Sequence, residues 1–442
     1  MKSFFYFSSS LLPPTFFITM NEDFLHYVWK FQKFSSLELT TVQGDSLQVQ
    51  KVGTHNLDAG PDFFYGQVVI GGQVWAGTIE IHKHSSHWYT HHHEKDSNYD
   101  TVILHVVWKN DMDIRHSDET SIPTLELKDR VDAGMLRNYN ELFSNQLQWI
   151  NCEDQFGSID EFVIKNWLDR LFLERLEQKS RSIFEQLDVS QNDWQAVLFQ
   201  LLCKNFGLKV NGSSFLSIAQ SLDHKVVKKC SQSLIQIEAL LFGQAALLEQ
   251  DKMDPYYEQL QENYSYSVVK YKISIEGVES AKFFRLRPPN FPTIRLSQLA
   301  NLLYKRPHLF SEVISVKILA ELYTIFNVSA SSYWDSHYNF DVISAKRKKS
   351  LTKEFINLLI INTVIPLKYC YAKEKGQDIS EEILQLTTTI KAEDNNIVKK
   401  FKSLSSFENN ALESQGLLEL KNNYCNKNKC LQCAIGNALL KK

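Results

Sequence analysis

Two carboxylates and a histidine stand at the ends of two strand-like runs in the segment GPDFFYGQVVIGGQVWAGTIEIHKH. Asp62 precedes the first run, and Glu80 and His82 lie at the end of the second. Because strand side chains alternate, Glu80 and His82 project to one face. A two-residue turn at Gly71-Gly72 would point Asp62 to the other face, whereas a single bulge or a three-residue turn would bring all three together. The segment therefore predicts a polar site, provided that the hairpin carries a bulge or a longer turn.

The chemistry that Asp62 and Glu80 could support is the binding of a hard divalent cation, Mg²⁺ or Mn²⁺. Such an ion polarises a phosphoryl oxygen and activates a water molecule for attack. His82, or the adjacent Lys83, would assist in activating that water. In the alternative interpretation, Asp62 caps a turn and Glu80 is an ordinary exposed strand residue.

Histidines are concentrated at the end of this segment and just after it, since residues 77–107 contain seven of the thirteen in the chain: His82, His84, His87, His91, His92, His93 and His105. They could bind zinc, because His82 and His84 share a strand face and His87 and His91 are four residues apart. No H-E-x-x-H motif is present, so a His-rich zinc hydrolase is the second alternative. His105 lies inside an apolar run and is expected to be a hydrogen-bonded core histidine.

A second group of potential ligands is the C-terminal segment YCNKNKCLQCAIG, which contains Cys425, Cys430 and Cys433. Zinc and iron–sulfur sites usually take four thiolates, and Cys152 in WINCEDQF is the best candidate for the fourth. One upstream cysteine followed by three at the C-terminus is similar, at a different spacing, to the iron–sulfur staple of AddB-type nucleases. The alternative is a set of free cysteines.

Three arginines surround a stiff proline turn in KFFRLRPPNFPTIRLSQLA, namely Arg285, Arg287 and Arg295. Arginines on a rigid loop could bind the phosphates of a nucleic acid, or they could hold the fold together through backbone carbonyls and acids. Trp88 could stack on a base, or it could pack a helix against the sheet.

Composition limits the classes of protein. The formal net charge of −3 excludes a globally basic nucleic-acid coat and leaves a local basic groove open. The odd number of cysteines, seven, indicates a reducing compartment and not a secreted disulfide framework. No apolar run approaches the ~20 residues of a membrane helix, so we expect no membrane partner.

The elements that must position the polar site follow from periodicity. A helix is predicted over 21–34 and a hairpin over 37–53 around Gly44-Asp45. The hairpin with the acids comes next, then a polar helix or loop over 85–98. YDTVILHVVW is predicted to be a central strand and SIPTLEL an edge strand. The order is α-β-β-β-α-β.

The domain organisation changes after residue 130. We predict an α/β core over 20–130 and a mostly helical domain over 131–442 with a short β segment near 264–275, which makes the fold class α+β. Met20 opens a helix-like start with acidic residues, so residues 1–19 are predicted to be a disordered extension. A signal peptide is the alternative there, although Pro13-Pro14 interrupts its apolar stretch.

Pro61-Asp62 and Glu80-Ile81-His82, in this order of elements, resemble the PD-(D/E)XK phosphodiesterase superfamily. The resemblance implies a restriction-endonuclease-like core with Asp62 and Glu80 as metal ligands. It also implies a contribution from Glu22 on the first helix. The family usually has lysine where this chain has His82. RecB-type members carry a Gln and a Tyr on the next helix, to which His93, Asp96 and Tyr99 are loosely similar. Their three-residue spacing predicts that these three residues share a helix face.

From about Met20 to the C-terminus, the chain also resembles an uncharacterised bacterial family that is defined by a domain of unknown function. The segments that carry this resemblance are EDFLHYVWKF, AGPDFFYGQVVIGG, GTIEIHKHSSHW, YDTVILHVVW, FRLRPPNFPTIRLSQLA and CLQCAIG. It implies a cytoplasmic bacterial protein and supplies no activity. The residues predict a metal-dependent nuclease acting on nucleic acid. A catalytically inactive nuclease-fold protein, acting as a nucleic-acid-binding protein or a scaffold, is the first alternative.

Overall fold

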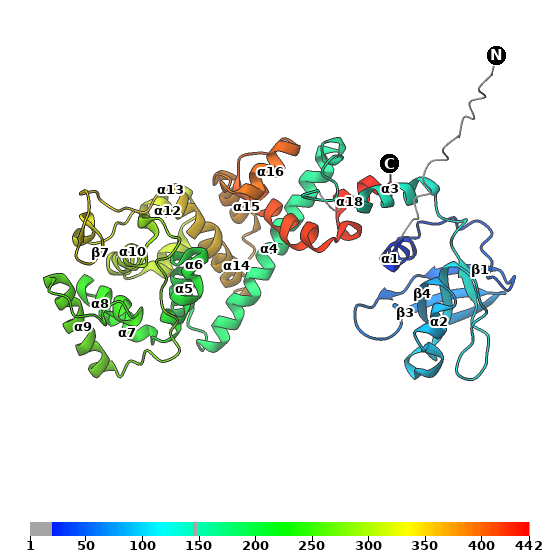
Figure 1. The fold of residues 1–442 in the computed structure, drawn as a ribbon, viewed down its shortest axis with the longest axis horizontal. Coiled ribbons are helices and arrows are strands. Elements are labelled where there is room, and N and C mark those ends of the chain that lie inside the picture. Colours follow the sequence, from blue (N-terminus) through cyan, green and yellow to red (C-terminus); the bar gives the residue numbers. More distant parts are fainter. Residues whose placement is uncertain (1–19, 145–147, 442) are drawn as a thin grey trace, which may run out of the picture. The chain divides into compact units, whose positions relative to one another are not determined.

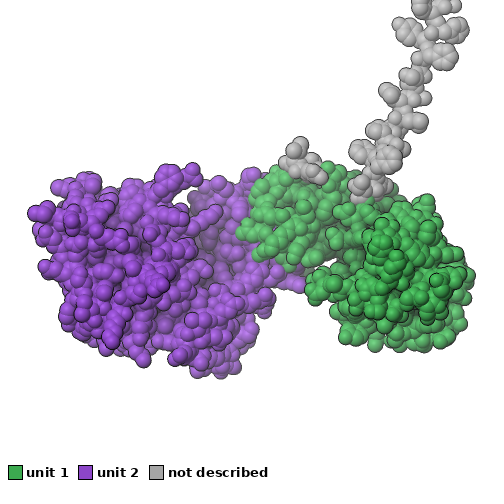
Figure 2. All heavy atoms as spheres, turned by 60° about the horizontal axis from the view of Figure 1, so that its bottom comes forward, with its two compact units in different colours: residues 1–164, 421–442 green, residues 165–420 purple. Residues whose placement is uncertain are grey.

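The computed structural model describes residues 20–144 and 148–441, so the extension predicted over 1–19 lies outside the described residues. The chain divides into two compact units, coloured green and purple in Figure 2. Unit 1 comprises residues 1–164 and 421–442, and unit 2 comprises residues 165–420. This division differs from the predicted one, because the C-terminal segment returns to the N-terminal unit.

Unit 1 is built around a six-stranded mixed sheet with the order β1-β3-β4-β5-β6, in which β2 also pairs with β3 (Figure 1). The strands β1, β3 and β4 are antiparallel, and β4, β5 and β6 are parallel. Their bounds are β1 Leu47–Lys51, β2 Thr54–His55, β3 Phe63–Ile70, β4 Gln73–His84, β5 Val102–Lys109 and β6 Thr124–Glu126. The predicted β3–β4 hairpin, central strand and edge strand are confirmed.

The β3–β4 hairpin carries a bulge. Its turn is Gly71-Gly72, with φ of 57° and 85°, and the pairing begins at Ile70 with Gln73. The register shifts by one residue between Gly66↔Gly77 and Phe63↔Ile79. Tyr65, within this shift, has φ of 60°, as a bulge residue often does. If this shifted register is continued by one residue beyond Phe63↔Ile79, Asp62 lies opposite Glu80.

The hairpin predicted over 37–53 forms only in part. Gly44 makes the expected turn, since its N–H donates to Thr41 O at 3.0 Å, and a single β-bridge joins Thr40 to Ser46. The second arm, β1, pairs instead along β3. The partner strand therefore comes from the longer apolar hairpin, which buries more surface than the polar segment 37–42 could.

Short helices complete unit 1, and α1 and α2 both lie beside β4. The α1 helix follows the predicted amphipathic pattern, since Phe24, Leu25, Val28 and Trp29 are buried. The helices are α1 Glu22–Lys30, α2 His87–Thr90, α3 Ala133–Ser144 and α18 Ala434–Leu440, with 3₁₀ turns η1 His93–Lys95, η2 Ser97–Tyr99, η3 Phe156–Ser158, η8 Cys425–Lys427 and η9 Cys430–Gln432.

The polar stretch 85–98 is not one continuous helix. Its helix α2 ends after one turn, because His92 adopts a left-handed conformation with φ of 60°. Asp96 then accepts a hydrogen bond from Asn98 N and starts the turn η2. The common helix face predicted for His93, Asp96 and Tyr99 is therefore wrong, although His93 and Tyr99 still meet by stacking.

Unit 2 is mostly helical, as predicted, with one small two-stranded sheet of β7 His337–Asn339 and β8 Val342–Ile343. The long helix α4 begins at Glu161 and continues through the start of this unit. Its elements are α4 Glu161–Val189, α5 Trp194–Phe206, α6 Leu208–Gln220, α7 His224–Cys230, α8 Leu234–Gln244, α9 Pro255–Tyr271, η4 Pro288–Asn290, α10 Pro292–Lys305, α11 Leu309–Ser315, α12 Leu319–Ile325, η5 Ser332–Asp335, α13 Lys353–Leu359, η6 Ile360–Val364, α14 Ile365–Glu374, α15 Ser380–Thr389, α16 Asn396–Leu404, α17 Ala411–Glu419 and the π-helical turn η7 Leu420–Tyr424, which reaches into unit 1.

The β segment predicted near 264–275 is wrong, because these residues largely continue α9. Asp254 caps this helix by accepting hydrogen bonds from Tyr256 N and Tyr257 N, and Pro255 occupies its first turn. The buried Tyr257 and Leu260 repeat at helical spacing. The alternation of tyrosines and valines is typical of a strand, but the N-cap at Asp254 favours the helix that forms.

One helix, Lys353–Glu374, is long and apolar enough to cross a membrane by length and composition alone. The sequence had suggested no run of that length. Of its apolar window, 72% is buried inside the structure, as in the core helix of a folded unit. No membrane partner is indicated for the described part of the chain.

Candidate functional site

Asp62 and Glu80 meet across the bulged end of the hairpin. The Asp62 backbone N–H donates to Glu80 Oε2 at 3.1 Å, and the Ile81 N–H donates to Asp62 Oδ2 at 2.9 Å. Glu80 is only 5% exposed, so the interpretation of Glu80 as an exposed strand residue is wrong. The bulge has brought the two carboxylates to one place.

The electrostatics of this pair favour a bound cation. Burial, followed by the negative charge of Asp62, raises the pKa of Glu80 to about 9. A carboxylic acid with this pKa is protonated at neutral pH when nothing positive is near it. A divalent cation between the two side chains would lower the pKa of Glu80 and keep both carboxylates ionised.

His82 lies beside Glu80 on the same strand face, with its Nε2 3.5 Å from Glu80 Oε1. Its Nδ1 lies 2.8 Å from His105 Nε2, and its Nε2 lies 3.1 Å from His91 Nδ1. Burial, followed by the neighbouring His105, lowers the pKa of His82 far below its usual range. His82 is therefore a neutral imidazole, the form that binds a metal or accepts a proton.

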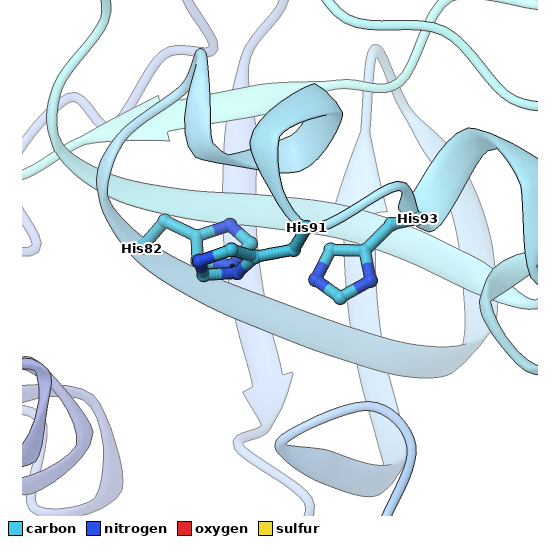
Figure 3. A group of neighbouring side chains, drawn as sticks. All are labelled: His82, His91 and His93. Carbon is cyan, nitrogen blue, oxygen red and sulfur yellow. Dashed lines mark hydrogen bonds between the residues drawn. The ribbon is translucent and has the colours of Figure 1, made fainter.

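Three imidazoles converge at this point (Figure 3). His82, His91 and His93 each offer one nitrogen, and these three atoms lie within 4.8 Å of one another. Figure 3 shows the rings over the strand that carries His82, with His91 and His93 reaching in from the following loop. His93 Nε2 also lies 3.4 Å from Glu80 Oε1, so the trio and the acid pair form one site.

The donor atoms suit a metal ion. Burial, followed by His91, lowers the pKa of His93 to about 4, so this ring is also neutral. His93 Nε2 and His105 Nδ1 are both buried, and neither has a hydrogen-bond partner among the described residues. Neutral imidazole nitrogens next to carboxylate oxygens form a mixed ligand set, which fits Mn²⁺ or Zn²⁺ better than Mg²⁺.

Residues of α1 and α2 surround the site. His26 Nε2 lies 3.2 Å from Asp62 Oδ2, and Glu22 Oε1 lies 3.4 Å from His87 Nδ1. The charge of Glu22 contributes to the raised pKa of Glu80, but its side chain pairs with His87 at the edge. Sequence reasoning missed His26. Its signal was the four-residue spacing from Glu22, which puts both on one helix face.

Lys83 lies on the opposite side of the strand from this group. It follows His82 directly in β4, where successive side chains point to opposite faces. The structure therefore does not bring Lys83 to the acid pair. Of the two residues that the sequence suggests for activating water, His82 is the one that lies beside Glu80.

Trp88 and Tyr99 are buried, so neither presents a ring face for a base. Trp88 is 0% exposed, its Nε1 donates to Arg115 O at 3.1 Å, and it packs in a core cluster with Ile114 and Ile122. This burial corrects the stacking role predicted for Trp88. Tyr99 stacks on His93 with ring centroids 3.8 Å apart, and thereby positions that imidazole.

The three arginines predicted to bind nucleic acid lie in unit 2, and they differ in exposure. Arg295 is buried, where Nη1 donates to Gln298 Oε1 at 2.9 Å and Nη2 donates to Asn290 Oδ1 at 2.6 Å. For Arg295 the structure agrees with the alternative of a role in holding the fold together, because a buried guanidinium with internal partners does not reach a phosphate. Arg285 and Arg287 are exposed.

The four candidate cysteine ligands all lie in unit 1 as free thiols. Cys152 is close enough to the other three that their charges raise its pKa, after burial as the larger cause. Asn151, next to Cys152, donates from Nδ2 to Cys430 Sγ at 3.5 Å. The upstream cysteine selected from the sequence is thus a neighbour of the C-terminal three.

No curated protein and no solved structure matches the chain. The sequence model of a family described as "Protein of unknown function (DUF2851)" matches residues 22–396, which is most of the chain. The matched range includes the acid pair and the imidazoles described above, and it ends before the C-terminal cysteines. The chain belongs to this DUF2851 family.

Proposed function

We propose that the protein is a metal-dependent phosphodiesterase that acts on nucleic acid, with Asp62 and Glu80 as ligands of a divalent cation. The observation that carries this proposal is the reciprocal pairing of the two acids, in which Glu80 Oε2 accepts from Asp62 N and Asp62 Oδ2 accepts from Ile81 N. Two carboxylates held together at a buried strand end need a positive charge to ionise together.

The arrangement of the elements supports the same reaction class. A helix, α1, precedes the hairpin that bears the acids, and the short helix α2 follows it. The next strand, β5, then pairs parallel to β4. This is the order that the PD-(D/E)XK resemblance implies, with Asp62 directly before β3 and Glu80 on β4.

His82 takes the position of the lysine of the superfamily and would orient the attacking water. When His82 Nδ1 donates to His105 Nε2, the lone pair of His82 Nε2 faces the space next to Glu80 and His91. A neutral imidazole in this tautomer can accept a proton from a water molecule. A divalent cation at the acids would supply charge neutralisation on the phosphoryl oxygen and lower the pKa of the water.

The imidazoles indicate which cation the site would prefer. Mg²⁺ favours oxygen ligands, whereas Mn²⁺ accepts the carboxylates and tolerates imidazole nitrogen beside them. His93 Nε2 and His82 Nε2 both lie within 3.5 Å of Glu80 Oε1. We therefore propose Mn²⁺ as the more effective of the two predicted cations.

A panel of polymers and cations tests the proposal. The full chain is stripped with EDTA and assayed on single- and double-stranded DNA and RNA with Mg²⁺, Mn²⁺ or Zn²⁺. We expect cleavage of at least one polymer that depends on added Mn²⁺ or Mg²⁺. Absence of cleavage with every polymer and cation contradicts the catalytic proposal. Binding without cleavage would then support the inactive nuclease-fold alternative.

The second candidate, a zinc hydrolase, is favoured by one observation, the convergence of His82, His91 and His93 within 4.8 Å. Three imidazoles with one open position are a common ligand set of catalytic zinc. His91→Ala separates the candidates, because His91 belongs to the trio but contacts neither acid in the described hydrogen bonds. Tightly bound zinc that is lost with His91→Ala, together with full activity of Asp62→Asn, favours the zinc hydrolase.

We also propose a cytoplasmic location. All seven cysteines are free thiols, including Cys203, Cys230 and Cys370 in the buried interior of unit 2. Free thiols in this number are typical of proteins from a reducing compartment.

A further inference from the structure

The C-terminal segment is anchored to the rest of unit 1 by polar contacts next to the cysteines. Lys421 Nζ donates to Trp149 O at 2.6 Å, and Asn151 Nδ2 donates to Cys430 Sγ at 3.5 Å. At the far end, Asn138 Nδ2 on α3 donates to Leu439 O on α18 at 3.2 Å. These contacts bring the turn that carries Cys152 against the segment that carries the other three cysteines.

The backbone of the C-terminal segment is folded tightly around its cysteines. Cys425 and Cys430 each open a 3₁₀ turn, and Asn428 between them has a positive φ of 52°. Cys433 is the N-cap of α18, and its N–H donates to Cys430 O at 3.2 Å. A side chain on Gly436 would collide with Cys430 O, so only glycine allows the turn to lie on the helix. The three thiols are thus held at fixed positions.

None of the four cysteines is in a disulfide. The thiolate of cysteine is the form that binds a metal, and four thiolates are the usual ligand number of zinc and iron–sulfur sites.

The spacing of the sulfur atoms distinguishes between metals. Tetrahedral zinc, with Zn–S distances of about 2.3 Å, holds its sulfurs ~3.8 Å apart. Among the described residues, the group whose ligand atoms all lie within 4.8 Å is the histidine trio, and no three of the cysteine sulfurs meet that spacing. An iron–sulfur cluster places its own iron and sulfide atoms between the thiolates, which requires a wider set.

We propose that Cys152, Cys425, Cys430 and Cys433 bind an iron–sulfur cluster that fastens the C-terminal segment to unit 1. The contact of Asn151 with Cys430 and that of Lys421 with Trp149 bring the four residues together from both chain segments of the unit. The chain between Cys152 and Cys425 contains the whole of unit 2. The cluster therefore closes the chain at the point where unit 2 is inserted, and stabilises unit 1 by restricting the separation of its two segments.

Metal analysis of the full chain, purified without oxygen, tests this proposal. We expect iron and acid-labile sulfide in a ratio of about one, with the visible absorbance of an iron–sulfur cluster. Cys152→Ser and Cys430→Ser should each lower the iron content ~10-fold or more. The matched control is Cys203→Ala, a buried cysteine of unit 2, which should keep its iron.

Three results would overturn the proposal: stoichiometric zinc in place of iron, no metal at these cysteines, or iron that is unchanged in both serine variants. A second measurement does not depend on the variants. Removal of the cluster from the wild-type chain by chelation should expose the segment after Lys421 to proteolysis, and its unchanged resistance would contradict the fastening role. Glu80→Gln should retain the iron, so the iron content tests the cluster independently of the nuclease proposal.

Discussion

Asp62 and Glu80 are joined across the β3–β4 hairpin, the backbone of Asp62 donating to the Glu80 carboxylate at 3.1 Å. The carboxylate of Asp62 accepts in return from the residue after Glu80, at 2.9 Å. Each acid is therefore positioned by the strand of the other. This relationship depends on a single extra residue in β3.

The bulge at Tyr65 is the first point to test. Tyr65 is 82% exposed and holds a left-handed conformation with φ of 60° that costs an ordinary residue ~1 kcal/mol or more. Tyr65→Gly should keep cleavage and leave the melting temperature equal or higher. Tyr65→Val, which is β-branched, should lower both.

Thermal melting and cleavage assays on the two Tyr65 variants give the comparison. If Tyr65→Val cleaves like wild type with an unchanged melting temperature, the bulge does not position Asp62.

The pH dependence of stability should reveal the buried carboxyl of Glu80. Its pKa is raised to about 9 in the folded metal-free chain from 4.5, so the folded state binds the extra proton between these values. This contribution to stability is complete below about pH 4.5 and is lost as pH rises through about 9. Glu80→Gln in EDTA should therefore gain stability relative to wild type as pH rises across that window.

Melting temperatures of both chains in EDTA across that pH range measure the difference. The control is Asp113→Asn, an exposed carboxylate of the same unit. A difference between Glu80→Gln and wild type that stays constant with pH would mean that Glu80 is ionised in the metal-free fold.

Lys179 in unit 2 predicts a second pH effect, unrelated to the site. Burial of its ammonium group, followed by the charge of Arg175, lowers its pKa to about 7 from 10.5. Its Nζ donates to Asn362 Oδ1 at 2.8 Å. Because the unfolded chain holds more protons between these values, stability is greatest above about pH 10.5 and falls toward pH 7.

Lys179→Met should remove this part of the pH dependence, as followed by urea unfolding at pH 7 and pH 10. Equal pH dependence in both chains would show that the ammonium of Lys179 is solvated in the folded state.

Arg295 should matter for stability and not for nucleic acid. Its guanidinium bonds Asn290 and Gln298 and lies over the ring of Phe355 at 3.6 Å. Arg295→Ala should destabilise unit 2 by about 2–3 kcal/mol, because it leaves buried polar partners unsatisfied. Arg285→Ala, at an exposed position nearby, should change the unfolding free energy little. The opposite ranking in a denaturant titration would restore a surface role to Arg295.

Much of unit 1 could be predicted from local patterns. The Gly71-Gly72 turn, the apolar run of β5 and the acidic start of α1 each carry a signal within a few residues, and all three were confirmed. The pairing partner of β1 could not be predicted in this way, because it depends on which distant strand buries more surface.

The candidate site was predictable in its residues but not in its geometry. A tyrosine does not predict a left-handed conformation, yet the left-handed conformation of Tyr65 determines on which face Asp62 lies. The approach of His91 and His93 follows from a left-handed break at His92, which the polar stretch does not reveal. In α9, the cap at Asp254 had more influence than the alternation that suggested a strand.

Cleavage by Glu80→Gln tests the central claim most directly. The wild-type chain, Glu80→Gln and the control Asp113→Asn are compared on the most rapidly cleaved polymer with saturating Mn²⁺. Loss of a metal ligand at the acid pair should lower the Glu80→Gln rate at least ~100-fold, while Asp113→Asn stays at the wild-type rate. A Glu80→Gln chain that is folded and cleaves as fast as wild type would contradict a catalytic role for the Asp62–Glu80 site.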